Sequence, residues 1–218
     1  MTMAKIRDNE LWALTHAERA ALAEDLATLT SAQWHHESLC GAWDVEQVVA
    51  HLSAAASIGQ WRWIRSMLGA RFRPNVHNLR RLREYLGATP EATLEQFRAV
   101  ITSTTAPTSD TAAYLGEILV HAEDIRFPLG LSRTPPMDAL MPVAEFYALR
   151  DFAVPSRSNA AGLHLKADDG PFAAGTGPLV EGPTLSLVMV MAGRRAHLDK
   201  LHGPGVQILR SRVNELGN

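Results

Sequence analysis

The chain has 218 residues, 46% hydrophobic and 20% charged, a composition typical of one large globular domain or of a domain with a smaller appendage. A formal net charge of −2 supplies no basic field, so nucleic acid is not expected as a partner. The single cysteine, Cys40, excludes an internal disulfide framework and, with no apolar run long enough for a signal peptide or a membrane span, predicts a cytoplasmic protein without membrane association.

The first two thirds of the chain predict helices. Residues 15–18, Thr-His-Ala-Glu, have the pattern of a capping box, which predicts a helix from there to about Leu29. Asp44-Val-Glu-Gln47 repeats this pattern and predicts a long helix to about Leu68 with an apolar stripe. Further helices are predicted over residues 75–86, from Pro90 onward, over 110–127 and over 136–151.

The pattern changes after Pro155. Residues 162–167 and 179–181 alternate like short strands, and two further helices are predicted over 185–192 and 206–216. We therefore predict a mainly α protein with two domains. Residues 1–154 form a helical bundle, and residues 155–218 form a small α+β domain.

Glu117 and His121 are four residues apart, so on a helix both side chains leave the same face. Asp124 falls on the same stripe, whereas Glu123 and Arg126 are expected to face water. Burying a carboxylate and an imidazole is costly unless they bind each other, a cation or a metal. From spacing alone, a Glu–His hydrogen bond inside the bundle and a solvated pair on its surface remain alternatives to a metal site.

His51, on the helix that follows Asp44, is the natural third ligand. Two imidazoles and a carboxylate leave coordination positions open, as in catalytic zinc sites, although other divalent ions accept the same ligands. The remaining histidines lack a suitably spaced partner and are expected to be structural. Cys40 lies beside Trp43 with no histidine or base spaced to activate it, so we expect it to be inert.

Two segments resemble a known family. Residues 38–52, SLCGAWDVEQVVAHL, and 116–130, GEILVHAEDIRFPLG, resemble the two metal-binding stretches of the mycothiol-dependent maleylpyruvate isomerase family, which has a DinB-like, four-helix-type bundle. The metal ligands of that family fall on His51, Glu117 and His121. Residues 162–213 are similar to the sterol-carrier-like domain often appended to it. The catalytic arginine of that domain falls on Arg194 or Arg195, which otherwise read as a surface pair at a helix end.

The resemblance implies a reaction. A divalent metal, with zinc preferred, holds mycothiol as a thiolate; the thiolate adds to the double bond of maleylpyruvate, and rotation followed by loss of the thiol gives fumarylpyruvate. An arginine pairs with the substrate carboxylates. The sequence therefore favours a thiol-using isomerase or S-transferase acting on a small molecule. A metal-dependent hydrolase and a non-catalytic metal- or ligand-binding bundle remain alternatives.

Overall fold

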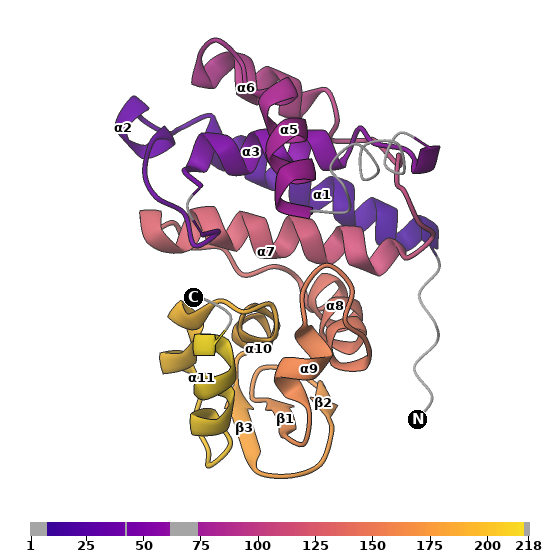
Figure 1. Cartoon of the computed structure of the whole chain (residues 1–218), viewed down its shortest axis with the longest axis vertical. Helices are drawn as coiled ribbons and strands as arrows, with labels where there is room; N and C mark the ends of the chain where they lie inside the picture. The colour runs from indigo at the N-terminus through magenta and orange to yellow at the C-terminus, as the bar shows by residue number, and fades with distance from the viewer. Residues whose placement is uncertain (1–7, 42, 62–73, 216–218) are drawn as a thin grey trace. The chain divides into compact units, whose positions relative to one another are not determined.

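The computed structural model describes residues 8–41, 43–61 and 74–215 (Figure 1). Over these residues the protein is mainly helical with one small sheet, as the sequence predicts. The chain divides into two compact units, Met1–Arg133 and Thr134–Asn218. The helices of the first unit are α1 (Asp8–Leu26), α2 (Ser31–Trp34), α3 (Val45–Ala55), α5 (Pro74–Tyr85), α6 (Pro90–Arg98) and α7 (Thr111–Leu129).

Helix α3 begins where the sequence predicts. The Asp44 carboxylate accepts a hydrogen bond from the Gln47 N–H at 2.8 Å, and the Gln47 side chain accepts one from the Asp44 N–H at 3.1 Å. These reciprocal bonds satisfy two donors at the helix start. The predicted continuous helix to Leu68 is wrong, because α3 ends at Ala55 and a turn follows; residues 62–68 lie outside the described residues.

Helix α1 begins earlier than predicted. It starts at Asp8, so Thr15 lies inside the helix and is not a cap. Its hydroxyl donates instead to the Leu11 carbonyl, four residues back, at 2.8 Å. The capping-box prediction at residues 15–18 is therefore wrong, because the Thr15 hydroxyl donates to a carbonyl of the preceding turn and accepts no N–H at a helix start.

Helix α7 is the most deeply buried long helix of the first unit, with most of its residues hidden from water. It packs against α1 and α3, and α3 in turn packs against α5 and α6 (Figure 1). With neighbours on several sides, α7 has no broad face left for water. Glu123 and Arg126 are 8% and 1% exposed, so the prediction that they face water is wrong. The Arg126 Nε donates to the Asp25 carboxylate of α1 at 2.7 Å.

A proline shapes the last turn of α7. Pro128 has no N–H to donate to the carbonyl of Asp124, which lies four residues before it. That carbonyl accepts a hydrogen bond from the Leu39 N–H at 3.0 Å, so the turn between α2 and α3 is attached to α7 at this point. The helix then ends at Gly130, whose φ of 65° is left-handed.

The second unit combines helices with the sheet. Its elements are α8 (Met137–Leu149), α9 (Ser156–Ala160), β1 (His164–Ala167), β2 (Ala173–Ala174), β3 (Leu179–Gly182), α10 (Thr184–Met191), the 3₁₀ helix η1 (Arg195–Lys200) and α11 (Val206–Glu215). The strand order is β2-β1-β3, with β1 antiparallel to β2 and parallel to β3. The buried apolar helix α10 packs against α8 and η1.

The boundary between the two compact units falls at a different residue from the predicted domain boundary. Helix α8 packs against α10, so the second unit begins at Thr134, whereas the change in sequence pattern put the division between residues 154 and 155. A fold-competent bundle of residues 1–154 stays a prediction. Of the helices that the structure describes, none combines the length and the apolar character needed to cross a membrane.

Candidate metal centre

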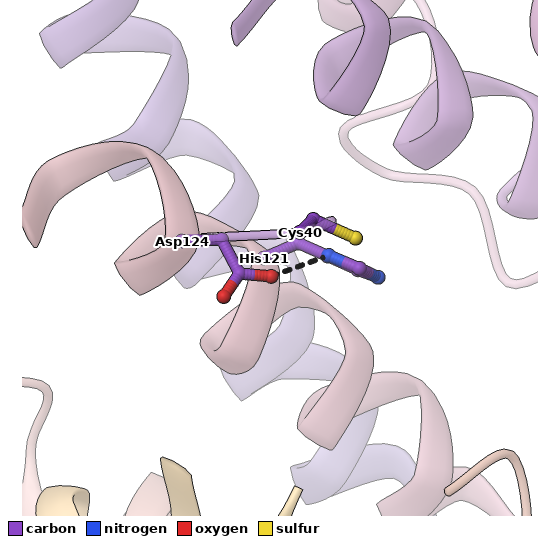
Figure 2. Close-up of side chains that lie close together, drawn as sticks. All are labelled: Cys40, His121 and Asp124. Atoms are coloured by element: carbon purple, nitrogen blue, oxygen red, sulfur yellow. Dashed lines mark hydrogen bonds and ion pairs between the residues drawn. The ribbon is translucent and has the colours of Figure 1, made fainter. Parts of the chain in front are cut away.

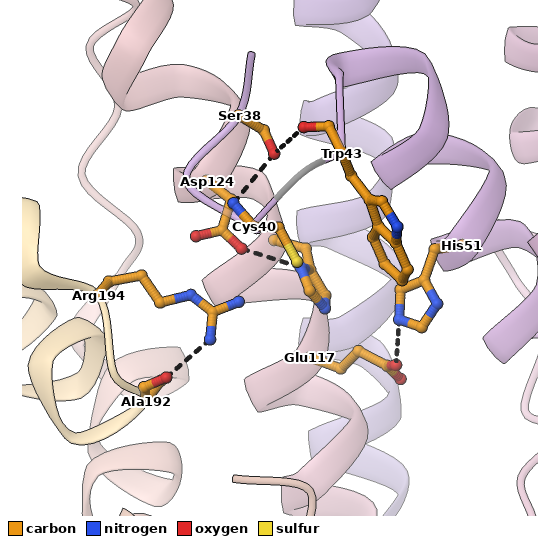
Figure 3. A network of polar contacts seen from close by, with 9 residues as sticks. Ser38, Cys40, Trp43, His51, Glu117, Asp124, Ala192 and Arg194 are labelled. Carbon is orange, nitrogen blue, oxygen red and sulfur yellow. Dashed lines mark hydrogen bonds and ion pairs between the residues drawn. The ribbon is translucent and has the colours of Figure 1, made fainter. Parts of the chain in front are cut away.

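Three predicted ligands meet between two helices of the first unit. His51 comes from α3 and Glu117 from α7 (Figure 3), and His121 follows Glu117 one turn later on α7. One donor atom from each lies within 4.8 Å of the other two. His51 is 8% exposed, and its ring meets that of His121 edge to face, with centroids 5.0 Å apart. The structure therefore brings together all three side chains that the sequence singled out.

The spacing of these donors fits one divalent ion. The Nε2 of His51 lies 3.4 Å from the Oε1 of Glu117. Two ligands at about 2.0–2.1 Å from a tetrahedral zinc are about 3.4 Å apart, so the pair needs little movement to share an ion. The side chain of Glu117 is 28% exposed, which leaves a side of the cluster open to water or to a ligand. Three protein ligands with an open side are typical of catalytic sites, not of closed structural ones.

The local sequence explains how His51 is held. The Asp44 cap fixes the start of α3, and Trp43, directly before it, packs its ring on that of His51 with centroids 5.0 Å apart (Figure 3). The imidazole is thus held between the Trp43 ring and the His121 ring. Fixed rotamers of this kind keep ligands oriented before an ion arrives.

Asp124 fixes the orientation of His121. Its carboxylate is fully buried and lies 3.0 Å from the Nδ1 of His121, one helical turn away (Figure 2). An Nδ1–H that donates to a carboxylate leaves Nε2 as the nitrogen that presents a lone pair to an ion. Carboxylates commonly orient metal-binding histidines in this way and raise their basicity. The sequence placed Asp124 on the correct stripe without assigning it this contact.

The electrostatics of Glu117 reflect its neighbours. Burial alone raises the pKa of a carboxylic acid, but the hydrogen bond to His51 and the nearby charges of His51, His121 and Arg19 together lower the pKa of Glu117 below its ordinary value. Arg19 is itself buried and donates to the carbonyls of Val100 and Ser103 at 3.2 and 2.8 Å. Glu117 is therefore held as a carboxylate, the form that ligates a metal.

His121 is shifted in the opposite direction. Burial lowers the pKa of an imidazole, but Cys40 and Asp124 outweigh it and raise the pKa of His121 to about 10. In the metal-free protein this histidine is therefore an imidazolium at neutral pH. A metal must displace that proton, so binding at this cluster is linked to proton release.

Cys40 is a neighbour of His121 that sequence reasoning missed. Its sulfur, a nitrogen of His121 and an oxygen of Asp124 all lie within 4.8 Å of one another (Figure 2). The sequence spacing that left Cys40 without a histidine or base to activate it overlooked His121 and Asp124, and the inertness of Cys40 stays a prediction. The two parts are far apart in sequence, and the bond from Leu39 to α7 that brings them together follows from Pro128, not from any helical spacing.

Arg194 lies in the second unit, between α10 and η1. Its guanidinium Nη1 donates to the Ala192 carbonyl at 2.7 Å, and its backbone N–H donates to the Met189 carbonyl at 2.9 Å (Figure 3). The side chain is half-buried, whereas that of Arg195 is exposed at the start of η1. The catalytic role predicted for Arg194 stays a prediction.

The fold and the cluster define a helical-bundle protein with a candidate divalent-metal centre and a second, α+β unit. Residues 15–110 match the family model described as the mycothiol maleylpyruvate isomerase N-terminal domain. The predicted resemblance to the mycothiol-dependent maleylpyruvate isomerase family is thereby confirmed. Residues 15–110 include His51 and end before α7.

Two solved structures share the fold over most of the chain. One is the crystal structure of mycothiol-dependent maleylpyruvate isomerase and the other is that of a mutant of it. Each matches with a TM-score of 0.64 and 16% sequence identity, covering 91% of this chain and 93% of the other. At that identity the likeness establishes the fold alone. No curated protein sequence matches the chain significantly.

Proposed function

We propose that this protein is a cytoplasmic, divalent-metal-dependent enzyme that uses a small-molecule thiol, of the maleylpyruvate isomerase or S-transferase type. The observation that carries the proposal is the three-donor cluster of His51, Glu117 and His121, open on one side, in a bundle that matches the mycothiol isomerase domain. Zinc is the ion that we propose first, because two imidazoles and one carboxylate are a common catalytic zinc set. When bound, the metal holds the thiol in its nucleophilic thiolate form.

The residues of the chain have separable tasks. His51 and Glu117 supply donors that are already at ligand spacing, so little reorganisation accompanies binding. Asp124 keeps the His121 ring in one orientation through Nδ1. The exposed side of Glu117 faces the open part of the cluster, where the thiol and the substrate are expected to enter. This division predicts that metal content and turnover respond differently to substitution.

The thiol step is tested by spectroscopy on the cobalt-substituted Cys40→Ser variant. Cys40 is the only cysteine of the chain, so in this variant any sulfur-to-cobalt charge-transfer absorption comes from the added thiol. Adding mycothiol is expected to produce that absorption. It should persist below the free-thiol pKa of about 8.5, because coordination removes the thiol proton. His51→Ala, which removes one ligand, is the matched negative control.

Turnover completes the test. Maleylpyruvate isomerisation is expected only when the thiol is present. Ester or amide hydrolysis without any thiol, together with unchanged cobalt spectra, would instead favour the metal-dependent hydrolase. Metal and ligand binding without turnover of either kind would favour the non-catalytic bundle protein.

Arg194 is the proposed partner of a substrate carboxylate. A planar guanidinium pairs with a carboxylate through two parallel hydrogen bonds, which suits a dicarboxylate substrate. Arg194→Ala should raise KM or lower kcat by about tenfold or more while metal content is unchanged. Arg195→Ala is the matched control, since that exposed neighbour carries the same charge. A larger loss in the Arg195 variant would move the assignment by one residue.

A further inference from the structure

Cys40, His121 and Asp124 form a second donor set beside the proposed metal centre. One donor atom from each lies within 4.8 Å of the other two, as in the first set, and the two sets share only His121. Cys40 does not group with His51 and Glu117 within that distance. Figure 2 shows the three side chains converging from the turn before α3 and from α7.

The turn that carries Cys40 is fixed by hydrogen bonds of its own. The Ser38 hydroxyl donates to the Trp43 carbonyl at 2.7 Å and accepts from the Cys40 N–H at 3.0 Å (Figure 3). Gly41, next in sequence, has a φ of 63°, a conformation that glycine adopts without strain. The Leu39 N–H binds the backbone carbonyl of Asp124 itself. The backbone next to Cys40 is thus bonded to α7 at the residue that supplies the carboxylate.

The spacing within this set suits an ion. The Nδ1 of His121 lies 3.0 Å from the Oδ2 of Asp124, a few tenths of an ångström below the separation of about 3.4 Å between two ligands of a tetrahedral zinc. An ion at this position would take the place of the proton that the two atoms share. A thiolate and a carboxylate together carry two negative charges, so they neutralise a divalent ion in this largely buried place. The first set carries only the charge of Glu117.

We propose that Cys40, His121 and Asp124 form a second metal-binding position, selective for thiophilic divalent ions, that competes with the first position for His121. Sulfur is a soft ligand and favours ions such as Cd²⁺ and Zn²⁺, whereas imidazole and carboxylate accept harder ions as well. The two positions share the one imidazole of His121, so we expect an ion bound at one of them to hinder binding at the other. A thiophilic ion bound through Cys40 then removes a ligand from the first position. This inference rests on the donor geometry and not on the proposed use of a thiol.

The test is a Cd²⁺ titration of the metal-free full-length chain, without added thiol, followed by ultraviolet absorption and by equilibrium dialysis. Wild-type protein should show thiolate-to-cadmium charge transfer and bind about one ion tightly. His51→Ala should keep that absorption, and Glu117→Gln repeats the test independently should the first variant fold poorly. Cys40→Ser should lose the absorption and still bind one ion through the first position, at least about tenfold more weakly. His121→Ala should lose tight binding altogether.

Two results overturn the inference. Loss of the cadmium absorption in both His51→Ala and Glu117→Gln would mean that Cys40 ligates the ion of the first position, so that no second position exists. Absence of the absorption in the wild-type protein would mean that Cys40 binds no ion. Two tightly bound ions per wild-type chain would overturn the competition, because His121 would then serve both positions at once. Thiol-dependent turnover can fail without affecting any of these readings.

Discussion

Helix α7 carries two buried groups of charged side chains that differ in kind. Near its end, Arg126 is buried and bonded to the Asp25 carboxylate of α1, so a positive group meets a negative one. Between one and three turns earlier, Glu117 and His121 meet His51, and every member is a potential metal ligand. The first group pairs opposite charges within the chain, although the Nη2 of Arg126 is buried without a hydrogen-bond partner, whereas the donors of the second group converge. A complementary charge pair is satisfied within the fold, whereas convergent donors indicate a site for a bound ion or ligand.

From this comparison we predict that substitutions in the second group mainly lower the metal content of the protein. His121→Ala should have the largest effect, because both donor sets include this imidazole. Metal content of purified protein, measured by elemental analysis, should fall from about one ion per chain to less than about a tenth. His35→Ala is the matched control, since His35 is exposed. Wild-type metal content in the His121 variant would mean that the ion is bound elsewhere.

The sequence identified the donors of the first set because their signals are local. Glu117 and His121 follow a helical period, and the Asp44 cap that orients α3 stands in sequence just before His51. The predicted α+β strands likewise follow local alternation. Arg126 and Cys40 were misjudged because their surroundings come from distant parts of the chain. A helical wheel assigns a polar side to water, yet α7 is covered on several sides, and α1 supplies the partner of Arg126.

The complementary group should respond in stability and not in metal content. Asp25→Ala leaves the buried Arg126 guanidinium without its carboxylate partner on α1, which should lower the free energy of unfolding by about 3 kcal/mol. Denaturant unfolding of the metal-free protein measures this loss. Asp199→Ala, which breaks an exposed pair with Arg210, should change stability by no more than the measurement error. A loss of metal from the Asp25 variant would show that the two groups on α7 are not independent.

Metal binding by the second group should depend on pH through the pKa of His121. Because the pKa of His121 is raised to about 10, an ion must displace its proton, and the apparent metal affinity should rise about tenfold per pH unit until that pKa is reached. The metal-free protein should show the opposite trend: stability from the protonated His121 is fully present below the unfolded pKa of about 6.5 and is lost as pH rises through about 10. Metal affinity and unfolding are measured across pH 6 to about 10. Asp124→Asn removes one of the charges that raise the pKa of His121. In this variant the plots of metal affinity and of unfolding free energy against pH should both become flat at a lower pH. Plots identical to those of the wild-type protein would contradict this account.

The smallest expected effect concerns the bond that attaches the Cys40 turn to α7. Pro128→Ala supplies an N–H that competes with the Leu39 N–H for the Asp124 carbonyl, and it improves the helix. The turn should open more often, so alkylation of Cys40 by iodoacetamide in the metal-free protein should be about two to five times faster. Pro142→Ala is the matched control, because it removes a proline from the interior of α8 and leaves the Cys40 turn unchanged. Mass spectrometry follows the reaction at this single cysteine. Equal rates in the two variants would mean that the hydrogen bonds of Ser38, and not the carbonyl freed by Pro128, hold the sulfur in place.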